Sequence, residues 1–82
     1  MEFEEILQRV IQLAQAQFEG HQGTIEEGAT ASDIHQWNSL SHVMLVTSIE
    51  GAFGIKFDLL QMIDMKSIGD IARVTYEAVK WA

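Results

Sequence analysis

The chain has 82 residues, no cysteine and no proline, and twelve acidic side chains against five basic ones give it a formal net charge of −7 at pH 7. Without cysteine it can form no disulfide and can supply neither a thiolate metal ligand nor a thiol nucleophile. The acidic charge disfavours nucleic acid and anionic membranes as partners, and no apolar run reaches the ~20 residues of a membrane span.

The first predicted element is a helix from Glu2 to about Phe18. Acidic residues in its first turn suit the positive end of the helix dipole. The same acidic start is opposite in charge to a secretory or transit peptide, so we expect a cytoplasmic protein. The apolar residues recur at steps of three and four and therefore share one face: Phe3, Ile6, Leu7, Val10, Ile11, Ala14 and Phe18.

A long connection without sustained periodicity follows, from Gly20 to Trp37. It contains turn and capping residues such as Gly23, Gly28 and Asp33. A loop of this length in a small domain tends to be functional or mobile. Its apolar residues are expected to attach it to the core: Ile25, Ala29, Ala31, Ile34 and Trp37.

The second helix is predicted to begin at Asn38–Ser39, because Asn and Ser are both favoured N-caps and an apolar run follows directly. Gly54 is a suitable residue to end it in a left-handed conformation. We expect Leu45 near the edge of the buried stripe, and the stripe itself to consist of Leu40, Val43, Val46 or Thr47, Ile49 and Phe53.

Two more helices complete the pattern. A short one is predicted from Asp58 to Asp64, and a longer one begins after Ser67 as N-cap, with Asp70 at the third helical position of a capping box, and extends to Trp81. Three longer helices and one short third helix predict an all-α four-helix bundle, formed by a single domain over residues 1–82.

The charge is unevenly distributed along the chain. Residues 1–50 hold eight acidic side chains and one basic, whereas residues 51–82 hold four of each. An acidic half attracts proteins that carry basic docking patches. Solubility alone is the alternative explanation.

Ser39 is the residue at which chemistry is expected. A serine at a helix start is exposed and lies near unpaired amide N–H groups, which stabilise a phosphate ester by roughly 0.3–1 kcal/mol. The neighbouring residues alone favour a simpler interpretation, in which Ser39 is only a helix cap.

Around Ser39 the sequence resembles the acyl carrier protein family. The family's attachment motif, Asp-Ser-Leu, stands here as Asn38-Ser39-Leu40. Its Phe-Gly-Ile-type turn after the second helix stands as residues 53–55, at the family's distance and without a gap. Trp37 and His42 are similar to the Trp-Asp-Ser-Leu-x-His variant of specialised stand-alone carriers. Residues 67–70, Ser-Ile-Gly-Asp, resemble the Thr-Val-Gly-Asp that begins the family's last helix, and the resemblance covers residues 33–75.

This resemblance implies an acyl-carrier-type bundle that catalyses nothing itself. Ser39 would bear 4′-phosphopantetheine, installed from coenzyme A by a separate phosphopantetheinyl transferase. The arm would supply the thiol that a chain without cysteine lacks. This thiol would carry acyl or aminoacyl groups as thioesters between acyl-loading and acyl-using enzymes. We expect a monomer working in fatty acid, polyketide or other specialised biosynthesis. The residues expected to flank the arm and contact partners are Trp37, Asn38, Leu40, His42, Val43, Met44 and Glu50.

The chain departs from the family at three places. The exposed face of the second helix, usually rich in Glu, here holds Met44, Thr47, Glu50 and Gly51. Asn38 replaces an Asp whose charge is expected to help the transferase dock. The third helix is apolar where carriers of fatty acid synthesis are acidic, which favours dedicated partners that dock through apolar contacts. By the same resemblance, an acyl chain could be sequestered in an interior formed by Val46, Ile49, Phe53, Ile63 and Ile68.

Other functions are weighed against the carrier. An unprimed, carrier-like docking module and a peptidyl or aminoacyl carrier both stay open. A hydrolytic triad of Ser39, His42 and Asp33 is disfavoured because the motif lacks a Gly-rich elbow and an evident oxyanion hole. A metal site at His35, His42 and Asp33 is disfavoured because their spacing matches no known ligand pattern.

Overall fold

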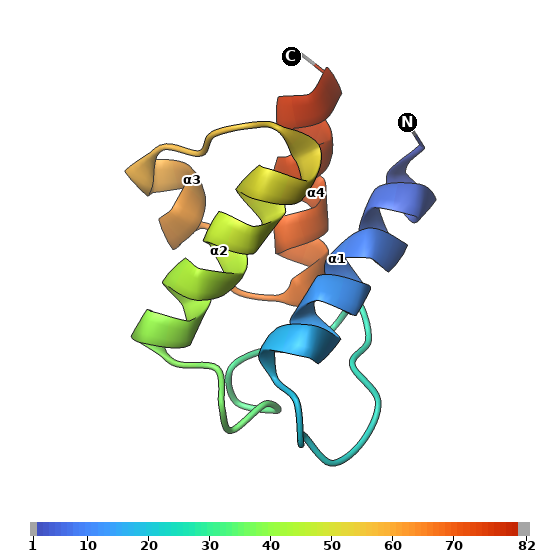
Figure 1. Ribbon diagram of the computed structural model, residues 1–82, viewed down its shortest axis with the longest axis vertical. Coiled ribbons are helices and arrows are strands. Elements are labelled where there is room, and N and C mark those ends of the chain that lie inside the picture. The colour runs from blue at the N-terminus through green and yellow to red at the C-terminus, as the bar shows by residue number, and fades with distance from the viewer. Residues whose placement is uncertain (1, 81–82) are drawn as a thin grey trace.

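A computed structural model describes residues 2–80 of the chain, and these form four helices and no strand (Figure 1). The helices are α1 (Phe3–Gln17), α2 (Ser39–Phe53), α3 (Leu59–Ile63) and α4 (Ile68–Lys80). The predicted all-α bundle with a short third helix is confirmed. The predicted extension of the last helix to Trp81 lies outside the described residues. Within residues 2–80, no helix is both long enough and apolar enough to cross a membrane.

The core is built around α1, which packs against both α2 and α4. Its predicted apolar face is buried at Ile6, Leu7, Val10 and Ala14, and Phe18 is buried just beyond the helix end. From α4, the side chains of Ile68, Ile71, Ala72 and Val74 complete one continuous apolar cluster. Removing this apolar surface from water is the main favourable contribution to folding.

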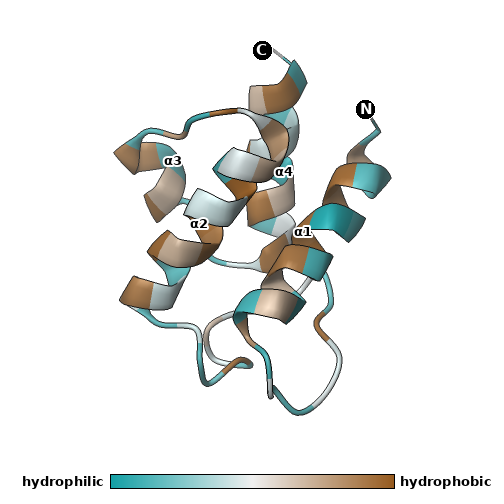
Figure 2. Cartoon of the chain, in the orientation of Figure 1, coloured by the Kyte–Doolittle hydropathy of each residue, from teal (hydrophilic) through white to brown (hydrophobic). Residues whose placement is uncertain are grey.

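The buried side of α2 differs from the prediction. Val46 and Ile49 are buried as expected, and Leu45, predicted at the edge, is also fully buried. Leu40 and Val43, predicted to be buried, are 72% and 52% exposed. Apolar residues occur on several sides of this helix (Figure 2), so its periodicity does not distinguish the buried side from the exposed one.

The long loop between α1 and α2 is fastened to the start of α4. The carbonyl oxygens of Glu27 and Ala29 accept hydrogen bonds from the N–H groups of Gly69 at 2.7 Å and Ile68 at 3.0 Å. Such first-turn N–H groups have no partner within their own helix, so the loop satisfies them. In the loop, the predicted core contacts Ile25, Ile34 and Trp37 are buried and Ala29 packs against the core, but Ala31 is exposed.

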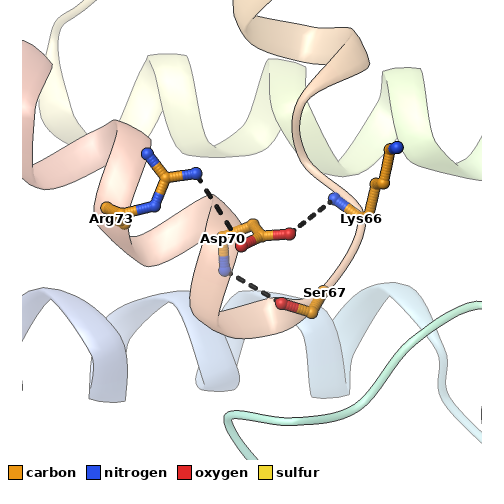
Figure 3. Close-up of polar contacts among 4 residues, drawn as sticks. All are labelled: Lys66, Ser67, Asp70 and Arg73. Carbon is orange, nitrogen blue, oxygen red and sulfur yellow. Dashed lines mark hydrogen bonds and ion pairs between the residues drawn. The ribbon is translucent and has the colours of Figure 1, made fainter.

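The start of α4 contains part of the predicted capping box (Figure 3). Ser67 Oγ accepts a hydrogen bond from the Asp70 N–H at 3.1 Å, as predicted. The reciprocal bond is shifted by one residue, because Asp70 Oδ2 accepts from the N–H of Lys66 at 3.2 Å. The other carboxylate oxygen of Asp70 lies 3.7 Å from Arg73 Nη2. At the end of α2, Gly54 has the predicted left-handed conformation, with φ 66° and ψ 39°.

Candidate functional site

Ser39 is the first residue of α2, and the residue that caps this helix is Asn38. Asn38 Oδ1 accepts a hydrogen bond from the Ser41 N–H at 3.0 Å, and Ser41 Oγ accepts one from the Asn38 N–H at 2.8 Å. Ser41 Oγ also donates to the Gln36 carbonyl at 2.8 Å. Ser39 therefore takes no part in the cap, and the interpretation of this serine as only a helix cap is wrong.

The hydroxyl of Ser39 is available for chemistry. Ser39 is exposed, and within residues 2–80 its side chain forms no hydrogen bond. The first turn of α2 contains no acidic residue, and its N–H groups form the positive end of the helix dipole. An exposed, unbonded hydroxyl at such a position fits a phosphate ester, because the ester's negative charge is stabilised there.

A pocket of about 430 Å³ opens beside Ser39. It lies between the loop before α2, the first turn of α2, the end of α3 and the connection to α4. Its surface is mainly apolar, and among the described residues that line it only Lys66 carries a formal charge. The rest of its lining, apart from Ser39 itself, consists of Ala31, Trp37, Asn38, His42, Met62, Ile63 and Met65.

Trp37 and His42 are linked by a hydrogen bond at the wall of this pocket. Trp37 Nε1 donates to His42 Nδ1 at 3.0 Å, and the two rings stack with centroids 6.0 Å apart. Because an indole N–H can only donate, Nδ1 carries no proton and the imidazole proton is on Nε2. His42 Nε2 lies 3.2 Å from the Met62 carbonyl oxygen and therefore donates to it.

These contacts bear on the two alternatives that use His42. Both of its ring nitrogens are engaged, by Trp37 and by the Met62 carbonyl, so neither accepts a proton from Ser39. Asp33 Oδ2 instead accepts hydrogen bonds from the N–H and the hydroxyl of Thr30. The three residues of the weighed triad are thus not joined. Over residues 2–80, no cluster of three or more His, Cys, Asp and Glu side chains could hold a metal ion.

The surface around Ser39 is apolar. Six large apolar side chains on α2 and α3 are about half exposed or more, and we call them the α2–α3 patch: Leu40, Val43, Met44, Leu59, Leu60 and Ile63. Met62 and Ile63 of α3 line the same pocket as Ser39, so the patch adjoins the site. Figure 2 shows the apolar colour over α3 and over the first turns of α2.

Glu50, expected to contact partners, is engaged within the protein. Its Oε2 accepts a hydrogen bond from the Phe57 N–H at 2.8 Å. The carboxylate therefore fixes the segment that follows α2, a structural role that the sequence did not indicate.

The residues expected to enclose an acyl chain do not lie around one cavity. Val46, Ile49 and Ile68 are fully packed in the core, and Phe53 is partly buried. Of the five, Ile63 lines the pocket beside Ser39. Met62, Met65 and Lys66, which also line it, were missed because no local pattern relates them to a serine more than twenty residues earlier.

The order and packing of the four helices are those of acyl carrier proteins. The solution NMR structure of the holo acyl carrier protein from Geobacter metallireducens matches with a TM-score of 0.82, covering 93% of this chain and 87% of that one at 28% sequence identity. No protein-family model matches the chain, and no curated protein is a significant match. The resemblance to acyl carrier proteins drawn from the motifs is confirmed by this structural match.

Proposed function

We propose that the protein is an acyl carrier protein that bears 4′-phosphopantetheine on Ser39 and catalyses nothing itself. The observation that carries the proposal is the exposed hydroxyl of Ser39, which forms no hydrogen bond within the described residues. Asn38 and Ser41 form the helix cap, so Ser39 has no part in it. The fold shared with a holo acyl carrier protein supports it. When bound, the arm supplies a thiol that holds the carried group as a thioester.

The residues of the chain present and orient this attachment point. Asn38 and Ser41 hold the first turn of α2, so that the Ser39 oxygen emerges at a fixed position on a rigid helix. First-turn N–H groups favour the negative charge of the phosphodiester. The protein then acts by tethering, which raises the effective concentration of the carried group at a partner's active site.

The pocket beside Ser39 favours an acyl group over an aminoacyl group. The ammonium of an aminoacyl thioester would need a carboxylate or other acceptors to replace water. The described residues that line the pocket include no carboxylate, and the charged one among them is Lys66, which would repel an ammonium. An uncharged acyl group meets mainly apolar surface there and incurs no such cost.

The partners we propose are a phosphopantetheinyl transferase and the enzymes that load and use the acyl group. They would dock on the α2–α3 patch through apolar contacts, since α3 contains no charged residue and Glu50 is the only acidic residue of α2. This surface favours dedicated enzymes of a specialised biosynthetic pathway. The monomeric state and the cytoplasmic location stay predictions.

Intact mass spectrometry tests the proposal. The protein is incubated with coenzyme A, magnesium and a broad-specificity phosphopantetheinyl transferase, beside Ser39→Ala and Ser48→Ala. Ser48 is a matched control, because it is another exposed serine of α2. We expect one phosphopantetheine to be added to the wild type and to Ser48→Ala, and none to Ser39→Ala.

The opposite result identifies the alternative. If several transferases leave the wild type unmodified and Asn38→Asp is also inert, the chain is an unprimed docking module. Modification of Ser39→Ala would place the arm on another residue and overturn the assignment of the site.

A further inference from the structure

The short helix α3 is held in place by little buried surface of its own. None of its five residues is buried, and Leu59, Leu60 and Ile63 are more than half exposed. Its apolar contacts with the core are made by Met62, which is partly buried, and by its buried flanks, Phe57 before it and Met65 after it. Because a helix this short is unstable alone, its position depends on these few apolar contacts and on polar contacts to the backbone of the segment.

Two side chains of α2 provide those contacts. Glu50 accepts a hydrogen bond from the Phe57 N–H, just before α3. His42 donates to the Met62 carbonyl, near the end of α3. Glu50 and His42 are about two helical turns apart on α2, so they bind the segment at both of its ends. Only the His42 contact is at the end of α3 that lines the pocket beside Ser39.

Trp37 determines which way His42 can bond. It occupies Nδ1 with its indole N–H, so the imidazole proton is on Nε2 and is directed at the Met62 carbonyl. Trp37 itself is buried, stacks on His42, and lies against Phe18 with ring centroids 5.8 Å apart. The imidazole is therefore oriented by a side chain that the core holds in place.

We infer that His42 is a positioning residue, which keeps α3 beside Ser39 through the hydrogen-bond chain Trp37–His42–Met62. These hydrogen bonds keep the pocket beside Ser39 formed before any group is attached, because Trp37, His42 and Met62 also line that pocket. The further step, that this pocket receives the arm or its cargo, rests on the proposed function. The positioning of α3 by His42 is independent of that function.

The test uses the unmodified protein and two substitutions that each keep one of the two hydrogen bonds. In His42→Gln the amide nitrogen reaches the place of Nε2 and can donate to the Met62 carbonyl. In His42→Asn the side chain is shorter, so its oxygen can accept from Trp37 but its nitrogen cannot reach Met62. Amide hydrogen exchange, followed by NMR, measures how often α3 opens relative to α1 and α4.

We expect His42→Asn to speed exchange in residues 59–65 by about tenfold, the effect of losing one hydrogen bond, with α1 and α4 unchanged. His42→Gln keeps a donor for the Met62 carbonyl but loses the bond from Trp37, so it should speed exchange by less than His42→Asn does. Trp37→Phe keeps an aromatic ring but removes the donor, and it should speed α3 exchange as well. In the wild type, imidazole ¹⁵N shifts should show a proton on Nε2 and none on Nδ1.

Three outcomes would overturn the inference: α3 exchange in His42→Asn that equals the wild type, equal acceleration in His42→Gln and His42→Asn, or equal acceleration in all four helices. These outcomes are distinct from failure of the proposed function, because no step of the measurement requires Ser39 to be modified. A protein that cannot be primed can still show the positioning of α3, and a primed carrier can lack it.

Discussion

Thr75 of α4 has a buried hydroxyl, and within residues 2–80 this hydroxyl has no hydrogen-bond partner. A threonine inside a helix often donates to the carbonyl four residues earlier, but Thr75 does not. A buried, unpartnered hydroxyl costs about 1–3 kcal/mol. Valine has a similar shape without that group, so we expect Thr75→Val to raise the free energy of unfolding by about 1 kcal/mol, measured by urea denaturation.

Thr47 of α2 provides the matched control for this substitution. Its hydroxyl is exposed and donates to the Val43 carbonyl at 2.8 Å, so Thr47→Val should change the free energy of unfolding by less than about 0.5 kcal/mol. A loss of stability in Thr75→Val would show that its hydroxyl has a partner in solution, such as a buried water.

At the scale of elements, the contact between the long loop and α4 depends on a residue without a side chain. A Cβ on Gly69 would lie 2.9 Å from Glu27 Cγ and 3.1 Å from the Glu27 carbonyl oxygen. That oxygen accepts the hydrogen bond from the Gly69 N–H, so it cannot move away without loss. We expect Gly69→Ala to lower the free energy of unfolding by about 1–3 kcal/mol, measured by chemical denaturation.

Gly51 is the control for the glycine substitution. It lies in α2 with no atom within 4 Å of the position of a Cβ, so Gly51→Ala should raise the free energy of unfolding by about 0.5–1 kcal/mol, the usual gain for alanine in a helix. Equal stabilisation by both substitutions would mean that the loop moves off α4 at no cost.

The elements also differ in how far the sequence predicts them. In α1 the buried residues follow a helical period, and the sequence predicts them well. The apolar residues of α2 occur on several sides, so its buried side is set by what packs on it. Leu40 and Val43 were predicted to be buried and are exposed, whereas Leu45, predicted at the edge of the buried stripe, is fully buried.

The candidate site, too, has residues that the sequence predicts and residues that it does not. Motif and resemblance predict Ser39 and its place at the start of a helix, whereas the pocket beside it depends on Met62 and Lys66, which only the tertiary fold brings there. The bond between Trp37 and His42 joins a loop residue to a helix residue. Such a pair follows no helical or strand period, and its bond was not predicted.

At the scale of the whole molecule, the acidic charge and the α2–α3 patch belong to different elements. Most of the acids in the first half of the chain are on α1 or on the long loop, whereas α2 contains Glu50 alone and α3 contains none. Glu50 is bonded to the Phe57 N–H. Asp58 and Asp64 lie at the two ends of α3, and Lys66 lines the pocket. The surface that adjoins Ser39 is otherwise apolar, and most of the attraction expected for basic docking patches would act through other parts of the molecule.

This separation predicts a weak salt dependence for any reaction at Ser39. Docking on apolar surface is little affected by screening, whereas docking between exposed charges weakens steeply as the Debye length falls from about 10 Å at 0.1 M salt to about 3 Å at 1 M. We expect the transferase kcat/KM to change by less than about threefold over this range. Leu60→Ser, which removes the most exposed side chain of the patch, should lower kcat/KM, and Glu4→Gln on α1 should not. Two results would show that partners dock through the acidic surface instead. One is a kcat/KM that falls tenfold or more over this salt range, and the other is a loss of kcat/KM in Glu4→Gln as large as that in Leu60→Ser.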